Sequence, residues 1–211
     1  MKISKDQIAA HNEKHNRNHQ TKWNFLKEQL QEKGLNVDGL IKQLQEFQIA
    51  IPSWALGTGA TRFGRFPIGG APLNLKEKMY DIGLLHALNQ SSGAISLHIP
   101  WDIPQDIQGI RDLAKELDLR FDAVNSNTFQ DQPGQKLSYR YGSLSHTDKA
   151  VRDQAIAHNL EVVDYGVKLG TNVLSIWLSD GAIFPGQNNV REALQRTYDS
   201  ISQIYSKMPD N

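Results

Sequence analysis

The feature that most constrains this chain is an alternation, after residue 47, of short apolar runs with longer amphipathic segments. Four apolar runs of strand length are each followed by a segment whose apolar residues recur at helical spacing. Parallel strands need a crossover between them, so this order predicts an α/β fold in which helices cover a parallel sheet. We expect the strands at residues 49–54, 94–101, 121–127 and 173–179.

The segments between these strands predict the helices. The first 47 residues are expected to be helical, over 4–33 and 36–47, and form a helical segment ahead of the sheet. The third helix that follows a strand is expected to begin at an N-cap provided by Ser145 or Thr147. The other expected helices lie at 75–89, within 102–118, at 147–169 and at 188–207.

From these elements alone, the sheet is either doubly wound or part of a (β/α)8 barrel. A complete barrel typically needs about 250 residues, and this chain of 211 residues stops where a fifth strand would begin. Consecutive strand order would favour the barrel, whereas a doubly wound sheet would place the first strand inside the sheet, as in the order 2-1-3-4.

Composition excludes several functional classes. Lys and Arg total 23 and Asp and Glu total 23, and this zero net charge disfavours nucleic-acid and membrane-surface binding. There is no cysteine, which removes disulfides and thiolate chemistry. No run approaches the ~20 apolar residues that span a bilayer, and the N-terminus lacks the apolar core of a signal peptide. These features predict a cytoplasmic protein.

Aromatic and polar residues gather where the expected strands end. The segment "SLHIPWD" begins as a buried strand and then presents a histidine, a tryptophan and an aspartate. Sites in α/β barrels form at the carboxyl ends of the strands, and aromatic rings beside hydrogen-bonding side chains suit a sugar. The alternative is that the rings are barrel core and that the histidine is a satisfied core residue. The candidate residues at these ends are Trp54, His98, Trp101, Phe129 and Trp177.

Four segments, in order from about residue 45 to the end, resemble the bacterial L-rhamnose isomerases of the broad-specificity branch. They are "IPSWALGTGATRFGRFP", "SLHIPWD", "FDAVNSNTFQDQPGQKLSYRYGSLSHT" and "SDGAIFPGQNN". The resemblance implies a xylose-isomerase-like (β/α)8 barrel, of which residues 48–211 would be the first half, as one apparently truncated domain after the helical segment 1–47. It also implies interconversion of an aldose and a ketose, L-rhamnose and L-rhamnulose, in a homotetramer that uses a divalent metal, commonly manganese.

The resemblance also implies roles for individual residues. His98 would contact the sugar ring or its O5 hydroxyl, and Trp54, Trp101, Phe129 and Trp177 would line the pocket. Phe63 would lie on a loop that reaches into the site of a neighbouring subunit. In the family the metal ligands and a lysine near the reacting carbons come from strands five to eight, so no catalytic or metal-binding residue is assigned in this chain. The alternative function is a non-catalytic sugar-binding or assembly fragment that pairs with another chain.

Three other signals are interpreted as structural. Gly57 and Gly59 suggest a dinucleotide-binding loop, but Arg62 occupies the position of the third glycine. Three histidines form one stripe of a very polar helix, which indicates a solvated face rather than a metal site; these are His11, His15 and His19. Three aspartates near the strands offer a possible carboxylate pair, although capping of loops is the simpler expectation; these are Asp102, Asp122 and Asp180.

Overall fold

The computed structural model describes residues 3–57, 69–181 and 186–209. Its four strands are β1 (Ala50–Pro52), β2 (Ala94–Ile99), β3 (Arg120–Thr128) and β4 (Leu174–Leu178), and a single 3-10 turn, η1 (Ser53–Ala55), follows β1. Its helices are α1 (Lys5–Glu32), α2 (Val37–Glu46), α3 (Leu75–Asn89), α4 (Ile107–Glu116), α5 (Lys149–Leu169) and α6 (Val190–Tyr205).

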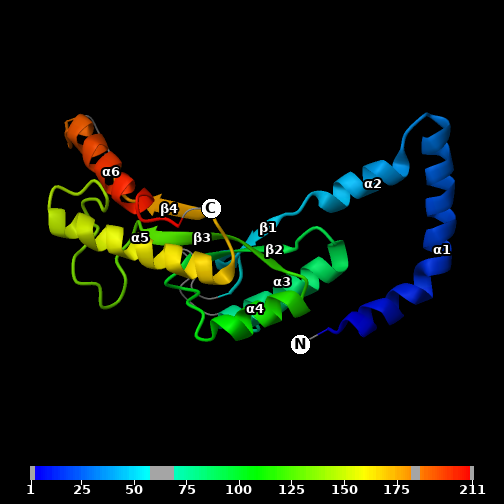
Figure 1. Cartoon of the computed structure of the whole chain (residues 1–211). Helices are drawn as coiled ribbons and strands as arrows, with labels where there is room; N and C mark the ends of the chain where they lie inside the picture. The colour runs from blue at the N-terminus through cyan, green and yellow to red at the C-terminus, as the bar shows by residue number, and fades with distance from the viewer. Residues whose placement is uncertain (1–2, 58–68, 182–185, 210–211) are drawn as a thin grey trace.

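The four strands form one parallel sheet in the order β1-β2-β3-β4. Each strand pairs with the next strand along the chain, which is the arrangement of consecutive strands in a (β/α)8 barrel and not that of a doubly wound sheet. The expected α/β fold is therefore confirmed as a partial TIM-barrel-like sheet of four parallel strands. Helices α3, α4 and α5 lie along one side of the sheet, and α6 follows β4 (Figure 1).

The apolar core lies between the sheet and these helices. Leu97 and Val124 are register partners on β2 and β3, and both are buried against helical side chains that include Met79, Ile82 and Val162. Strand residues alternate between faces, so His98 and its partner Asn125 point to the opposite face. The sheet therefore has one apolar face toward the helices and a second face that carries polar groups.

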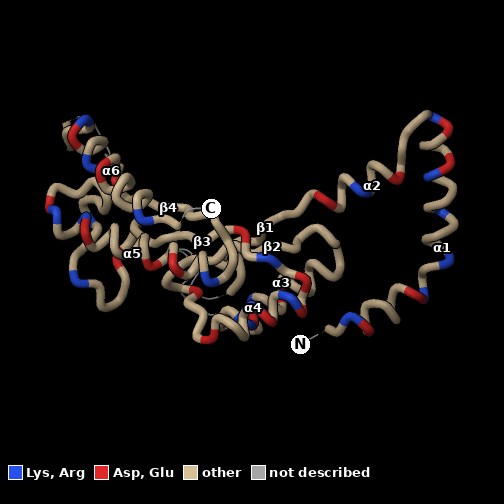
Figure 2. Tube along the Cα trace, viewed as in Figure 1, with Lys and Arg blue, Asp and Glu red and all other residues tan. Residues whose placement is uncertain are grey.

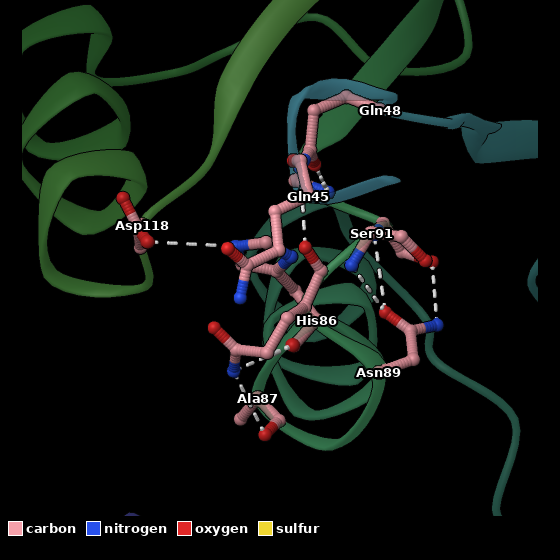
Figure 3. Close-up of polar contacts among 10 residues, drawn as sticks. Gln45, Gln48, His86, Ala87, Asn89, Ser91 and Asp118 are labelled. Atoms are coloured by element: carbon pink, nitrogen blue, oxygen red, sulfur yellow. Dashed lines mark hydrogen bonds and ion pairs between the residues drawn. The ribbon is translucent and has the colours of Figure 1, made fainter. Parts of the chain in front are cut away.

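Side-chain amides hold the strands in register at their amino ends. The Gln48 side chain accepts a hydrogen bond from the Gly93 N–H at 2.9 Å and donates to the carbonyls of Gln45 and Gln90 (Figure 3). The Gly93 carbonyl in turn accepts from the Arg120 N–H at 3.0 Å. The entries to β1, β2 and β3 are thus linked at the end of the sheet away from the expected site.

Several boundaries differ from expectation, for local reasons. The first strand ends at Pro52 rather than residue 54, and the second ends at Ile99, just before Pro100. A proline has no N–H to contribute to a sheet ladder, so strands tend to end beside it. The expected cap of α5 was wrong: its N-cap is Asp148, whose side chain accepts from the Ala150 N–H.

The N-terminal helices project from the sheet on the side of β1 (Figure 1). Helix α1 begins at a Ser4–Gln7 capping box, and none of its 28 residues is buried. Large apolar side chains on these two helices are exposed, among them Phe25, Leu40 and Leu44. The helical segment therefore contributes little to the core.

Positive and negative side chains are interspersed along the described chain (Figure 2). Each helix of the described residues carries acidic residues, and basic residues accompany them on every helix. This mixture agrees with the zero net charge. Within the described part of the chain, no helix combines the length and hydropathy that a membrane span requires.

Candidate functional site

Five side chains from the four strand ends form one cluster of rings. The His98 ring stacks on the Trp101 ring, with centroids 3.8 Å apart and planes 19° apart. Trp54 meets both His98 and Trp177 edge to face, at 5.8 and 5.7 Å between centroids. Phe129 lies 5.6–6.3 Å, between ring centroids, from the rings of His98, Trp101 and Trp177. We refer to these five residues as the ring cluster.

Each residue of the ring cluster lies at, or shortly after, the end of a strand. Trp54 lies in η1 directly after β1, and Trp101 lies in the turn after β2. His98 and Trp177 are near the last residues of β2 and β4, and Phe129 follows β3. Because parallel strands have their carboxyl ends at one edge of a sheet, residues far apart in sequence meet there. The structure thus brings together five of the six residues expected at the site, and the sixth, Phe63, lies outside the described residues.

The His98 ring is buried in this cluster, and its two nitrogens, Nδ1 and Nε2, have no hydrogen-bond partner among the described residues. The relative exposure of this residue is 1%. Burial lowers its pKa from 6.5 to about 4; Asp102 opposes this shift, while His158 and Lys78 add to it. At neutral pH the imidazole is therefore uncharged and offers one donor and one acceptor. This contradicts the alternative of a satisfied core histidine.

Hydrogen bonds from β3 fix the tryptophan of β4. The Trp177 Nε1–H donates to Asn125 Oδ1 at 3.0 Å, and Asn125 Nδ2 donates to the Leu97 carbonyl at 2.8 Å. Thr128 Oγ1 donates to the Trp177 carbonyl. Asn125 therefore connects β2, β3 and β4 beneath the ring cluster and sets the direction of the indole.

A second asparagine on the same face is unsatisfied. Asn127 is 2% exposed, and its side-chain oxygen and nitrogen both lack partners among the described residues. It lies two residues beyond Asn125 on β3 and pairs in register with Trp177. Buried polar atoms are nearly always paired, so His98 and Asn127 together present unused hydrogen-bonding capacity beside the ring cluster.

A buried ion pair lies at the same end of the sheet. Lys78 Nζ, on α3, is 2.7 Å from Asp102 Oδ1, and the two side chains are 3% and 1% exposed. Asp102 Oδ2 accepts from the His98 N–H at 2.9 Å and from Ser53 Oγ. Sequence reasoning missed Lys78 and Ser53. The signal for Lys78 is its position on the stripe of α3 that carries the buried residues Leu75, Met79 and Ile82.

The three candidate aspartates have separate partners and form no carboxylate pair. Asp180 accepts from the Ser143 N–H, the Ser143 hydroxyl and the Ser145 N–H, and so closes the loop before α5. Asp122 lies beside Arg120 at 3.3 Å, toward the amino end of β3. Loop capping, the simpler expectation, describes Asp180, whereas Asp102 belongs to the buried ion pair.

The described residues do not form a site for a divalent metal. No group of three or more His, Asp or Glu side chains in the described ranges converges so that it could hold an ion. The His11 and His15 rings are 5.5 Å apart, but both residues are exposed on α1. The metal implied by the family resemblance therefore has no ligand set among these residues, and none of them is assigned to it.

Comparisons with known proteins give two long matches. The chain is 45% identical over 186 residues to a protein of Rhizobium meliloti (strain 1021) named "Probable sugar isomerase", and 44% identical over 184 residues to one of the same name from Mesorhizobium japonicum. These alignments cover 88% and 87% of this chain but only 43% of each relative. Superposition on a solved L-ribulose 3-epimerase gives a TM-score of 0.49 at 15% identity, over 76% of this chain and 45% of that one.

No family model matches the chain. It is nevertheless similar, over nearly nine-tenths of its length, to two proteins named as sugar isomerases, and it spans less than half the length of each.

Proposed function

We propose that this chain supplies the sugar-contacting half of an aldose–ketose isomerase whose substrate pair is L-rhamnose and L-rhamnulose. The observation that carries the proposal is His98, a buried, uncharged imidazole with two free nitrogens, enclosed by four aromatic side chains. The similarity to two proteins named as sugar isomerases supports the reaction class.

The ring cluster suits a sugar because it combines apolar faces with a few hydrogen-bonding atoms. Sugar C–H groups pack on aromatic rings, and each hydroxyl needs a partner once it leaves water. The uncharged His98 imidazole would accept from one hydroxyl and donate to another oxygen, such as O5. Asn127 offers an amide donor and acceptor beside it. In this proposal these residues bind and orient the substrate, and the aromatic walls exclude water.

The hydrogen transfer between C1 and C2 needs groups that the described residues do not supply. A divalent metal such as manganese stabilises negative charge that develops on substrate oxygens, but no described residues form a ligand set. The proposal therefore assigns this chain substrate binding only. Assembly as a homotetramer, a cytoplasmic location and entry of Phe63 into a neighbouring subunit's site belong to the same proposal.

The test uses the protein at its natural length, with manganese present and L-rhamnose as substrate. We expect isomerisation to L-rhamnulose, and we expect His98→Asn to raise KM and lower kcat. Asp164→Asn, at an exposed residue of α5 that pairs with Lys168, is the matched control and should behave as wild type. Unchanged KM in the His98 variant would remove this residue from the pocket.

Two further outcomes would revise the proposal. Turnover of another aldose with no turnover of L-rhamnose would retain the reaction class and replace the substrate. Sugar binding without turnover of any aldose at natural length would favour the non-catalytic sugar-binding alternative.

A further inference from the structure

The buried carboxylate of Asp102 contacts residues of η1, β2 and α3. Of these elements, η1 carries Trp54 and β2 carries His98. Asp102 Oδ2 accepts from the backbone N–H of His98, and also from Ser53, which immediately precedes Trp54. Asp102 itself immediately follows Trp101, and the Asp102 N–H donates to the His98 carbonyl at 2.9 Å. Three ring-cluster residues are therefore tied to Asp102: His98 donates to its carboxylate, Trp54 follows a residue that does, and Trp101 directly precedes Asp102.

The positively charged partner of Asp102 lies on helix α3 and not in the turn after β2. Lys78 reaches Asp102 Oδ1 from α3, so the carboxylate joins the ends of β1 and β2 to a covering helix. Burial of two charges is expensive, and apolar side chains of similar volume are often equally stable. An ion pair at 3% and 1% exposure is thus poorly explained by stability alone.

We propose that Asp102 and Lys78 are positioning residues of the sugar site: the carboxylate fixes the backbone that carries His98 and Trp101, and the ammonium balances its charge. Neither residue needs to touch the sugar. This inference rests on the proposed function for its ligand, although the effect on His98 is independent of any sugar.

Burial and nearby charges together set the protonation state of His98, with burial the largest effect. The charged or titratable groups that influence this ring are Asp102 in the same loop, Lys78 on α3 and His158 on α5. Asp102 alone favours a protonated imidazole, and Lys78 opposes it. With both present, burial dominates and His98 stays uncharged, which leaves one ring nitrogen free to accept a hydroxyl. A protonated ring would have no acceptor.

The experiment uses the protein at its natural length, three test and control variants, and a fourth variant, H98Q, that assigns the fluorescence transition. K78M removes the ammonium and retains the apolar stem; K78M/D102N removes both charges; K168M breaks an exposed ion pair on α5 and serves as the control. Two readouts are taken for each: L-rhamnose affinity by calorimetry between pH 5 and 8, and tryptophan fluorescence against pH without sugar. Protonation of His98 is visible in the second, because a protonated imidazole stacked on an indole quenches it, and H98Q identifies that transition.

We expect wild type and K168M to bind sugar equally across this pH range and to show the His98 transition near pH 4. In K78M the transition should move to higher pH, because the Lys78 ammonium disfavours a protonated His98 and the Asp102 carboxylate left behind favours one. Its sugar affinity should fall about tenfold or more, by analogy with the loss seen when residues that orient metal ligands are removed. The affinity should weaken further as the pH falls. K78M/D102N should bind about tenfold more weakly, without the new pH dependence.

Three results would overturn the inference. These are a K78M transition that stays near pH 4, a loss of affinity in K78M with the wild-type pH profile, and wild-type affinity in K78M/D102N. Should K78M not fold, the double variant, which buries no charge, still decides the question by its affinity. If wild type binds no sugar, the proposed function fails, while the fluorescence transition still judges the ion pair.

Discussion

Asn125 offers a direct test of how the site is held together. In Asn125→Leu, a side chain of similar shape loses the acceptor for Trp177 Nε1–H and the donor to the Leu97 carbonyl. Each buried hydrogen bond contributes about 1 kcal/mol net, and a donor left without a partner costs about 1–3 kcal/mol. Trp177 is 41% exposed, so its N–H can recover part of this from water. We therefore expect the free energy of unfolding to fall by about 1–3 kcal/mol.

The assay is urea unfolding at neutral pH, followed by circular dichroism, on the protein at natural length. Asn24→Leu is the matched control, because Asn24 makes one exposed hydrogen bond on α1, and exposed substitutions usually change stability by less than about 0.5 kcal/mol. Two results would refute the view that Asn125 fixes the β2–β3–β4 end of the sheet. One is a fall in the free energy of unfolding of less than about 0.5 kcal/mol in the Asn125 variant, and the other is an equal fall in both variants.

Three further predictions follow from the same contacts. The pKa of His98 is lowered in the folded state, so the unfolded chain binds the proton first as pH falls; the stability due to neutral His98 is complete above about pH 6.5 and is lost as pH falls through about 4. His98→Asn should therefore unfold with a shallower pH dependence between pH 6.5 and 4, and an unchanged dependence would contradict the burial argument. Residues 1–211 expressed alone should aggregate or associate rather than form an active monomer, because β1 and β4 are open edges of the described sheet and an apolar stripe of α6 is exposed; monodisperse monomer by light scattering with isomerase turnover would refute this. Asn127→Leu should weaken L-rhamnose binding measured by calorimetry while leaving the fold intact, since the Asn127 amide has no partner that its removal would orphan, and unchanged affinity would place Asn127 outside the site.

The sequence was sufficient to predict the elements of the sheet because each strand and helix carries its own pattern. The helix over 75–89 was expected at the residues where α3 forms, and the four strands were located to within a few residues. The shortened first strand and the Asp148 cap depend on single residues whose effect competes with the apolar pattern around them.

The ring cluster could be anticipated because its members all follow from one rule, that parallel strands end at the same edge. The polar contacts that hold the ring cluster in place could not be anticipated. Lys78 pairs with Asp102 across 24 positions, and Asn125 meets Trp177 across 52, so neither contact has a local signature. A lysine on an apolar helical stripe indicates a buried partner, but the partner's identity is fixed only by the packing of α3 against the strand ends.

The central claim is that the ring cluster around His98 binds a sugar. A crystal structure of the protein at its natural length, grown with L-rhamnose, tests it most directly. The account predicts a sugar oxygen within about 2.7–3.2 Å of His98 Nδ1 or Nε2, with Trp101 and Trp177 against the sugar. The claim would be contradicted by a sugar bound elsewhere while both His98 ring nitrogens remain without a partner among the aromatic side chains of the ring cluster.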